Sequence, residues 1–328
     1  MNAVSGPERG AALLTVLILV GIMGAIAVAT FDRLRLATML TGNAVGLDQA
    51  RAFALDGEAL ATVRIDDLVK ASPQKTTLAG GWQGRTTTLP LPGGTALVRV
   101  KDGSNCFNLN SLVVGTPPDA LVSRPLAIEQ FANLMQLLEI PTANARRIAA
   151  SAADWIDSDD SPNADGAEDA VYARAAKPYR TANSFMAEAS ELRAVNGVTP
   201  DIYARLRPWI CALPVAELSP INVNTLTPEQ APLLAMMFGE ALRPDAARRV
   251  IGERPQAGWN GIADFWNAPT LRDFPPPGEV LQQPQVSTQW FAIDLQIDVG
   301  GTALHETGLI DARKAPARIA ARRWTGEE

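Results

Sequence analysis

The chain has 328 residues, of which 47% are hydrophobic and 20% are charged, so it is long enough for two domains of ordinary size with a buried core. Its 29 Lys and Arg residues and 35 Asp and Glu residues give a net charge of −6, which argues against a protein whose main partner is the phosphate backbone of nucleic acid. The single histidine, His305, excludes a multi-histidine metal centre.

The N-terminal region contains an uncharged run of twenty residues at 11–30, AALLTVLILVGIMGAIAVAT. As a helix this run would span roughly 30 Å of hydrocarbon. It is longer than the apolar region of a secretory signal peptide and more uniformly apolar than a core helix, so it predicts one membrane span. The polar leader MNAVSGPERG ends directly before the run, which suggests cleavage between Gly10 and Ala11 with the membrane helix kept on the mature protein.

The helical pattern continues beyond the apolar run, from Phe31 to about Ile65, with apolar residues among polar ones. This spacing predicts an amphipathic extension of the helix that packs on a globular domain. Gly42, Gly46 and Gly57 argue against an unbroken helix.

The middle of the chain changes from strand to helix patterns and back. Residues 86–103 predict a hairpin, because a Pro-Gly-Gly turn precedes the alternating run Ala96 to Val100. Between about 113 and 284 almost every segment has helical spacing. The expected helices are Arg124 to Leu138, Asn144 to Ile156, Met186 to Ala194, Asp201 to Trp209, Pro228 to Phe238 and Pro244 to Gly252.

Strand patterns return at 289–299 and 303–310, and a mixed apolar and basic stretch follows near 317–324. Strands on both sides of the helical region predict an α+β fold with a large all-α domain inserted between strands. A tandem arrangement would leave the C-terminal strands unpaired.

The two cysteines, Cys106 and Cys211, are far apart and form no CxxC motif, so little supports a zinc or thioredoxin-like site. In an exported domain a structural disulfide is favoured over two buried free thiols. Such a bond would stabilise the fold by roughly 4 to 5 kcal/mol in the chain-entropy model.

The negative charge is concentrated between Asp154 and Asp169, a window with seven acids and no Lys or Arg. Outside this window 28 acids oppose 29 bases, so the rest of the chain is nearly neutral. Calcium suits such a cluster, because it takes six to eight oxygen ligands. The alternative is a solvated acidic turn that caps neighbouring helices. The seven acids are Asp154, Asp157, Asp159, Asp160, Asp165, Glu168 and Asp169.

The spacing of this window partly matches an EF-hand loop that begins at Asp157. The sixth position is Pro162, however, where that loop needs Gly for its sharp turn. We therefore expect a calcium loop of another kind.

Motifs for enzymatic chemistry are missing from the sequence: there is no Walker loop, GxGxxG, HExxH or GxSxG. His305 is expected to be a surface histidine with satisfied ring nitrogens rather than a catalytic one. A calcium-dependent periplasmic hydrolase would have only the acidic cluster in its favour. The sequence therefore predicts a protein that is not an enzyme.

A competing interpretation concerns residues 220–265, which resemble the helix-hairpin-helix DNA-binding module of competence proteins. The Gly-rich hairpin that presents backbone amides to phosphate is replaced here by Phe238-Gly239-Glu240-Ala241-Leu242. Helix packing without nucleic acid is the preferred interpretation, and a membrane-anchored, competence-type DNA-binding protein is the alternative.

Several motifs in a fixed order resemble the GspK family of minor pseudopilins of type II secretion, over almost the whole chain. They are Arg9-Gly10 before the apolar helix, Asn105-Cys106-Phe107-Asn108-Leu109-Asn110, Trp155-Ile156-Asp157 with Gly166-Ala167-Glu168-Asp169, Glu191-Leu192, Cys211-Ala212-Leu213-Pro214 and Ile221-Asn222-Val223-Asn224-Thr225.

This resemblance implies a pilin-like fold, in which the N-terminal membrane helix packs on an antiparallel sheet and the helical domain is inserted between strands. The implied divisions are a prepilin leader at 1–10, the long helix and first strands at 11–112, the calcium-binding helical domain at 113–285 and the last strands at 286–328. It also implies a disulfide between Cys106 and Cys211. The implied ligands of one or two calcium ions are Asp157, Asp159, Glu168 and Asp169, then Asn183 and Asp160; Asp165 matches no motif of the family.

The resemblance further implies cleavage by a prepilin peptidase after Gly10 and N-methylation of Ala11. Most pilin-like subunits carry a glutamate at the fifth mature position, which here is Thr15. A subunit without this acid cannot neutralise the ammonium of a subunit above it, which suits the tip of a pseudopilus. The implied partners are minor pseudopilins I and J and the inner-membrane assembly platform. The implied location is the bacterial inner membrane, spanned once, with the C-terminal domain in the periplasm.

Overall fold

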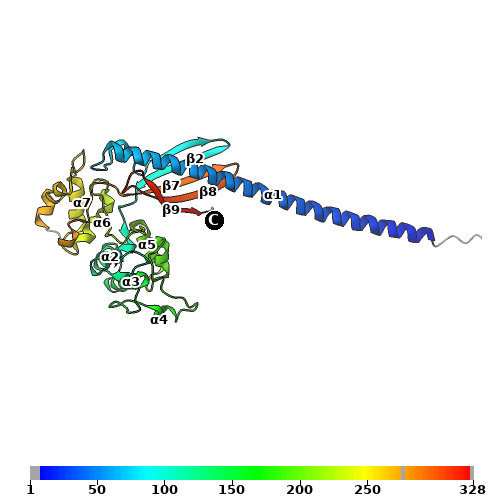
Figure 1. Cartoon of the computed structure of the whole chain (residues 1–328). Coiled ribbons are helices and arrows are strands. Elements are labelled where there is room, and N and C mark those ends of the chain that lie inside the picture. Colours follow the sequence, from blue (N-terminus) through cyan, green and yellow to red (C-terminus); the bar gives the residue numbers. More distant parts are fainter. Residues whose placement is uncertain (1–7, 275–277, 326–328) are drawn as a thin grey trace, which may run out of the picture.

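The computed structural model describes residues 8–274 and 278–325 of the chain. Most of the expected leader, residues 1–7, lies outside the described residues. The longest element is α1, Glu8–Ala71, a helix of 64 residues that extends far from the rest of the molecule (Figure 1). It is long and apolar enough to cross a membrane, and the mean hydropathy of its most apolar part is 2.7. All side chains from 11 to 45 are exposed.

The predicted continuation of the helix is confirmed, and α1 runs unbroken through the three glycines that had counted against its continuity. Two of these glycines instead lie where α1 approaches the sheet. A Cβ atom on Gly57 would be 3.1 Å from Leu295 Cδ2, and one on Gly46 would be 2.4 Å from Thr302 Oγ1. Their lack of a side chain therefore lets the helix lie close to two strands.

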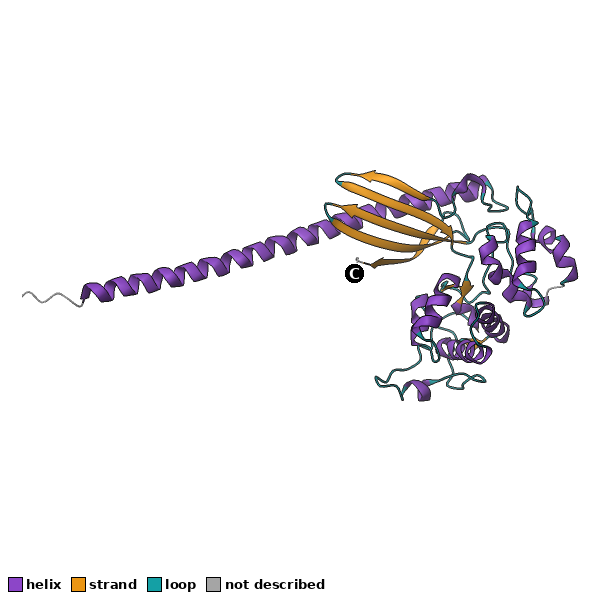
Figure 2. Cartoon of the chain, turned by 180° about the vertical axis from the view of Figure 1, so that it is seen from behind, coloured by secondary structure: helices purple, strands orange, loops and turns teal. Residues whose placement is uncertain are grey.

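Five strands form one antiparallel sheet in the order β1-β2-β7-β8-β9. Their bounds are β1 Thr86–Leu91, β2 Gly94–Asp102, β7 Trp290–Val299, β8 Thr302–Asp311 and β9 Arg318–Thr325. The predicted hairpin and both predicted C-terminal strands are confirmed. Because β2 pairs with β7, strands from the two sides of the helical region meet in the middle of the sheet (Figure 1). Figure 2 shows the strands of this sheet in orange, side by side along the second half of α1.

One face of the sheet packs against the second half of α1. Phe291, Ile293 and Leu295 of β7 lie in a core with Ala61 and Ile65 of the helix. A neighbouring core joins Ala50 and Ala54 of α1 to Ile297, Val299 and Leu304. In this half of α1, one face of the helix is buried against strand residues. The apolar side chains of its N-terminal half, in contrast, are exposed. The mixed α and β fold expected from the sequence is confirmed.

The region between β2 and β7 is built from short helices and two-residue strands around a single large core. Phe107 and Phe131 stack in this core with ring centroids 4.6 Å apart. The elements, with η1 Ala79–Gly81 before β1, are β3 Phe107–Asn108, η2 Leu109–Leu112, β4 Val113–Val114, β5 Val122–Ser123, α2 Pro125–Leu137, α3 Thr142–Ile156, α4 Asp169–Tyr172, η3 Ala189–Ala194, α5 Pro200–Leu206, η4 Arg207–Trp209, β6 Ile210–Cys211, η5 Pro228–Gln230, α6 Ala231–Ala235, η6 Met236–Phe238, α7 Pro244–Gly252, α8 Ile262–Trp266, η7 Pro269–Asp273 and η8 Gly278–Val280.

Most predicted helices are present, and α7 has the predicted bounds. The helix expected from Met186 begins only at Ala189. The reason is that the backbone N–H of Met186 donates to Asn110 Oδ1, and its carbonyl accepts from Asn110 Nδ2, which holds this residue outside a helix. The segment 228–238 forms three short pieces, η5, α6 and η6, rather than one helix.

Candidate functional site

The acidic window forms a loop that folds around the carboxylate of Asp154, which is completely buried in the last turn of α3. Asp154 Oδ1 accepts hydrogen bonds from Asn163 N at 3.0 Å and Asn163 Nδ2 at 2.5 Å. Asp154 Oδ2 accepts one from Ala167 N at 2.6 Å. Three N–H donors on one carboxylate make it the centre of the loop.

The chain lies so close to Asp154 that it requires glycine at position 166. A Cβ atom there would be 1.9 Å from Asp154 Oδ2. The preceding Asp165 has a φ of 68°, in the left-handed region that aspartate tolerates better than most residues. Sequence reasoning counted Asp154 among the acids but missed its role in positioning the loop; its place in the last turn of a predicted helix, directly before the loop, was the available signal.

Two further carboxylates of the window, those of Asp157 and Glu168, are also buried, with 1% and 6% of their surface exposed. Asp157 Oδ2 accepts a hydrogen bond from Ser123 Oγ at 2.6 Å. Asp157 Oδ1 and both oxygens of Glu168 have no hydrogen-bond partner among the described residues. Buried polar atoms without partners are rare, so these three oxygens require an explanation.

The electrostatic environment of this pair disfavours its ionised form. Burial raises the pKa of Asp157 to about 6, with the hydrogen bond from Ser123 opposing the rise and neighbouring aspartates adding to it. Burial raises the pKa of Glu168 to about 7, and the charges of Asp154 and Asp157 raise it further. A cation between them would remove both penalties.

The other predicted ligands lie around this pair in different settings. Asp159 and Asp160 are exposed in the loop, and Asp159 Oδ1 accepts a hydrogen bond from Ser161 N. Asp169 Oδ1 accepts bonds from Thr181 N and Oγ1, both at 2.9 Å, which lower the pKa of Asp169. Asn183 is exposed, has a φ of 45° and donates its backbone N–H to Trp155 O.

Within the described ranges, no three Asp, Glu, His or Cys side chains are arranged so that they could hold a metal ion. Asp157 and Glu168 lie close enough for the charge of Asp157 to raise the pKa of Glu168, whereas Asp169 Oδ1 accepts hydrogen bonds from Thr181. The three unpartnered oxygens still fit a hard cation, because carboxylate oxygens are the ligands that Ca²⁺ prefers.

A second cluster is formed by the asparagines of two Asn-rich motifs, the first at 105–110 and the second at 221–225. Asn222 and Asn224 are completely buried. Asn222 Nδ2 donates to Thr76 O and to Thr288 Oγ1, and its backbone N–H donates to Asn105 Oδ1 at 2.8 Å. The asparagines of the segment that resembles a DNA-binding module therefore form hydrogen bonds inside the protein.

These asparagines lie at the junction between the sheet and the helical domain, and Asp102 at the end of β2 belongs to the same junction. It is buried and accepts hydrogen bonds from Thr225 Oγ1, Thr288 Oγ1 and Ser104 N. Burial raises the pKa of Asp102, and these bonds lower it in part. Sequence reasoning missed Asp102, whose two threonine partners are more than 120 residues away.

The first Asn-rich motif is held next to a disulfide between Cys106 and Cys211, as predicted. Cys106 directly precedes β3 and Cys211 ends β6, and these two strands pair in parallel. Asn108 of β3 is buried: its Nδ2 donates to Val215 O, and its Oδ1 accepts from Leu213 N. The motif thus joins two segments that are about 100 residues apart.

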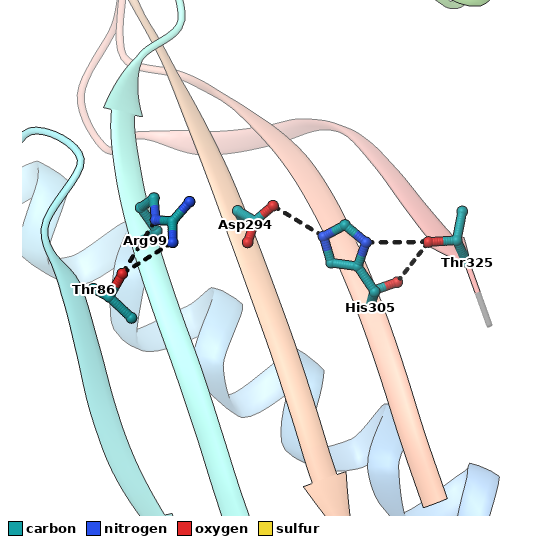
Figure 3. Close-up of polar contacts among 5 residues, drawn as sticks. All are labelled: Thr86, Arg99, Asp294, His305 and Thr325. Carbon is teal, nitrogen blue, oxygen red and sulfur yellow. Dashed lines mark hydrogen bonds and ion pairs between the residues drawn. The ribbon is translucent and has the colours of Figure 1, made fainter. Parts of the chain in front are cut away.

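His305 lies in a polar row on the outer face of the sheet, opposite to α1 (Figure 3). Its Nε2 is 2.9 Å from Asp294 Oδ2, and its Nδ1 is 3.3 Å from Thr325 Oγ1. Both ring nitrogens have partners, and the side chain is 36% exposed. The partners that could not be identified from the sequence are therefore Asp294 of β7 and Thr325 of β9.

At the other end of the molecule, Thr15 lies on the exposed N-terminal part of α1. Its hydroxyl donates to the carbonyls of Ala11 and Ala12 in the preceding turn of the same helix. The bond between Gly10 and Ala11 lies within α1.

Comparison with known proteins identifies related sequences along nearly the whole chain. Residues 105–215 and 221–289 match the two parts of the family described as type II secretion system (T2SS), protein K. The type II secretion system protein K of Pectobacterium carotovorum subsp. carotovorum is 35% identical over 322 residues, which is 97% of each chain. That of Aeromonas hydrophila is 37% identical over 303 residues, or 90% of each chain.

A solved structure shares the fold. It is from the crystal structure of the GspK-GspI-GspJ complex of the enterotoxigenic Escherichia coli type 2 secretion system. The TM-score is 0.75 at 30% sequence identity, and the match covers 85% of the present chain and 97% of the other.

Proposed function

Because this chain belongs to the type II secretion system protein K family and is therefore a minor pseudopilin, we propose that it forms the tip of the pseudopilus. The observation that supports this position is the separation of its two ends. The exposed apolar half of α1 lies at one end of the molecule, and the inserted helical domain lies at the other, beyond the sheet (Figure 1). With α1 among the helices of other subunits, this domain would face away from them and block further stacking.

Electron microscopy of isolated pseudopili with antibodies against residues 113–285 tests the tip position. We expect labelling at one end of each pseudopilus only. Labelling along the length would overturn the proposal. Antibodies against a more abundant pseudopilin provide the control that all subunits are accessible.

The proposal includes processing of the N-terminus. A prepilin peptidase would cleave between Gly10 and Ala11 and methylate the new amine of Ala11. The mature protein would then begin with an uncharged run and remain anchored by one span in the inner membrane. Mass spectrometry of the protein from membranes tests this step, since an intact leader or cleavage after residue 30 would contradict it.

Thr15 supports a terminal place in the helical bundle. An isolated ammonium in an apolar medium is costly, and a glutamate at this position would neutralise the ammonium of the subunit above. The hydroxyl of Thr15 is bonded to its own helix and carries no charge. This subunit can use the acid of the subunit below but offers none to a subunit above.

Minor pseudopilins I and J are the proposed neighbours, since the E. coli relative of known structure forms a complex with GspI and GspJ. The inner-membrane assembly platform is the proposed site of insertion. The large domain would lie in the periplasm, an oxidising compartment that suits the Cys106–Cys211 disulfide. Co-purification of the full chain with both minor pseudopilins tests the first of these assignments.

Calcium is the proposed resident ion of the acidic loop. Asp157 and Glu168 would hold it through their unpartnered oxygens, with Asp159 and Asp160 the next candidates. When bound, the ion would neutralise carboxylates that are otherwise buried without a counter-charge. Thermal unfolding in calcium and in chelator tests the assignment, and equal melting temperatures in both would contradict it.

A further inference from the structure

A cleft of about 800 Å³ separates the helical domain from the outer face of the sheet. One wall consists of η3, the start of η4 and the segment from Cys211 to Leu213. The other consists of β8 and β9 at Thr307–Leu309 and Ala321–Arg323. Its lining residues belong in part to α5 and β9, both labelled in Figure 1. Its volume is within the range of sites that take small ligands or short peptide segments.

The cleft is basic, although the chain as a whole has a net charge of −6. Arg193, Arg207 and Arg323 line it, and Glu188 is the only acid among the lining residues that the structure describes. In the described part of the chain, neither Arg193 nor Arg207 has a carboxylate within ion-pair distance. Arg322 also borders the cleft, but its guanidinium is bonded to Glu58 of α1 behind the sheet.

Apolar surface lies between these charges. Ala212 and Leu309, both half-buried, line opposite walls of the cleft. Arg193 sits over the ring of Tyr203, 5.8 Å from its centroid, which holds the guanidinium at the edge of this surface. Such a surface suits a segment that carries both carboxylates and a large apolar side chain.

An ion pair between Arg323 of β9 and Glu188 of the helical domain crosses the cleft. Both side chains are partly exposed, at 52% and 40%, so their interaction is weak. A carboxylate from outside can therefore replace Glu188 as the partner of Arg323 at little cost.

From these contacts we propose that the cleft binds an acidic, partly apolar peptide segment of another protein. Its carboxylates pair with Arg193 and Arg207 and replace Glu188 on Arg323, while an apolar side chain lies between Ala212 and Leu309. This binding is a property of the cleft and does not depend on the position of the subunit in the pseudopilus.

Fluorescence anisotropy with a labelled peptide, Glu-Leu-Glu-Leu-Glu with blocked ends, tests the proposal on the full chain in non-ionic detergent. The same peptide with Gln in place of Glu is the probe for charge. We expect the acidic peptide to bind at least tenfold more tightly, because charged hydrogen bonds are about twice as strong as neutral ones. No binding, or equal affinity for the two peptides, would overturn the proposal.

Substitutions locate the binding. The double variant Arg193→Gln/Arg207→Gln should weaken binding of the acidic peptide about tenfold. The matched control is Arg146→Gln/Arg272→Gln, which removes the same charge from exposed positions outside the cleft. An equal loss in both double variants would show attraction by overall charge and would overturn a site in the cleft.

Replacement of Glu188 by the peptide as the partner of Arg323 is tested by a variant that should strengthen binding of the peptide. Glu188→Gln removes the internal competitor, so the acidic peptide should bind severalfold more tightly. Unchanged or weaker binding would overturn the exchange. Since the peptide assay needs no pseudopilus, its failure would leave the tip position untouched, and end-labelling of pseudopili would still decide that position.

Discussion

Replacement of Asp154 by Asn tests the role of this carboxylate as the centre of the acidic loop. The amide oxygen of asparagine can still accept the two hydrogen bonds from Asn163, but its NH₂ group cannot accept the N–H of Ala167. A buried N–H without a partner costs roughly 1–3 kcal/mol. The two remaining bonds lose their charge, at a cost of about 1 kcal/mol each. We therefore expect a loss of roughly 3–5 kcal/mol in the free energy of unfolding.

The loss should depend on pH. Near pH 5 Asp157 and Glu168 are protonated, because their pKa values are about 6 and about 7. At pH 8 they are ionised in the calcium-free chain, and Asp154→Asn then also relieves repulsion between neighbouring carboxylates. The destabilisation should therefore be smaller at pH 8 than at pH 5.

Urea unfolding of the full chain in detergent and chelator, followed by tryptophan fluorescence, measures this effect. Asp160→Asn is the matched control, because Asp160 has the same charge but is exposed in the same loop. We expect the control to change stability by less than about 0.5 kcal/mol. Equal stability of the two variants would refute the assignment of Asp154 as the residue that holds the loop.

Other parts of the structure allow three further tests. Glu168 binds its proton more tightly in the folded protein than in the unfolded chain, so the calcium-free protein loses stability as pH rises through about 7. Glu168→Gln should therefore raise the melting temperature of the calcium-free protein at pH 8 and leave it unchanged at pH 5. The same variant should reduce the stabilisation by calcium. Cys106→Ala/Cys211→Ala opens a loop of 105 residues and should cost up to about 4.8 kcal/mol in urea unfolding, with no effect of reductant on the variant. Asn222→Leu leaves buried groups such as Thr76 O without their donor and should cost at least about 3 kcal/mol, whereas a neutral result would contradict the role of Asn222 at the junction.

Local patterns in the sequence predicted most elements of the fold. The alternation in 289–299 and the helical spacing in 244–252 each depend on neighbouring residues, and both elements formed within one residue of the predicted bounds. Gly46 and Gly57 misled because intrinsic propensity disfavours glycine in a helix. Their value appears only once the sheet is present, since the contacts with Thr302 and Leu295 come from strands more than 200 residues away.

The candidate site was predictable in composition but not in geometry. Acid density indicated a cation-binding loop, and the two buried carboxylates with unpartnered oxygens, Asp157 and Glu168, were both among the predicted ligands. The sequence could not separate Asp154, which positions the loop, from Asp157, because both are aspartates close together at the end of α3. Both carboxylates are buried, so the three N–H donors distinguish Asp154, and these donors are not visible in a linear pattern.

At the junction the two domains meet through buried polar side chains, among them Asp102 and Asn222. Burial of a carboxylate and two asparagines costs desolvation, which an apolar contact would avoid. An apolar contact, however, tolerates sliding, whereas the bonds from Thr225 and Thr288 to Asp102 form together in one relative orientation. If the proposed tip position holds, a helical domain that faces away from α1 needs a fixed orientation more than it needs additional stability. On this reasoning, Asn222→Leu should broaden the range of distances between spin labels on Thr87 of the sheet and Arg146 of the helical domain, and an unchanged distribution would mean that the polar bonds do not set the orientation.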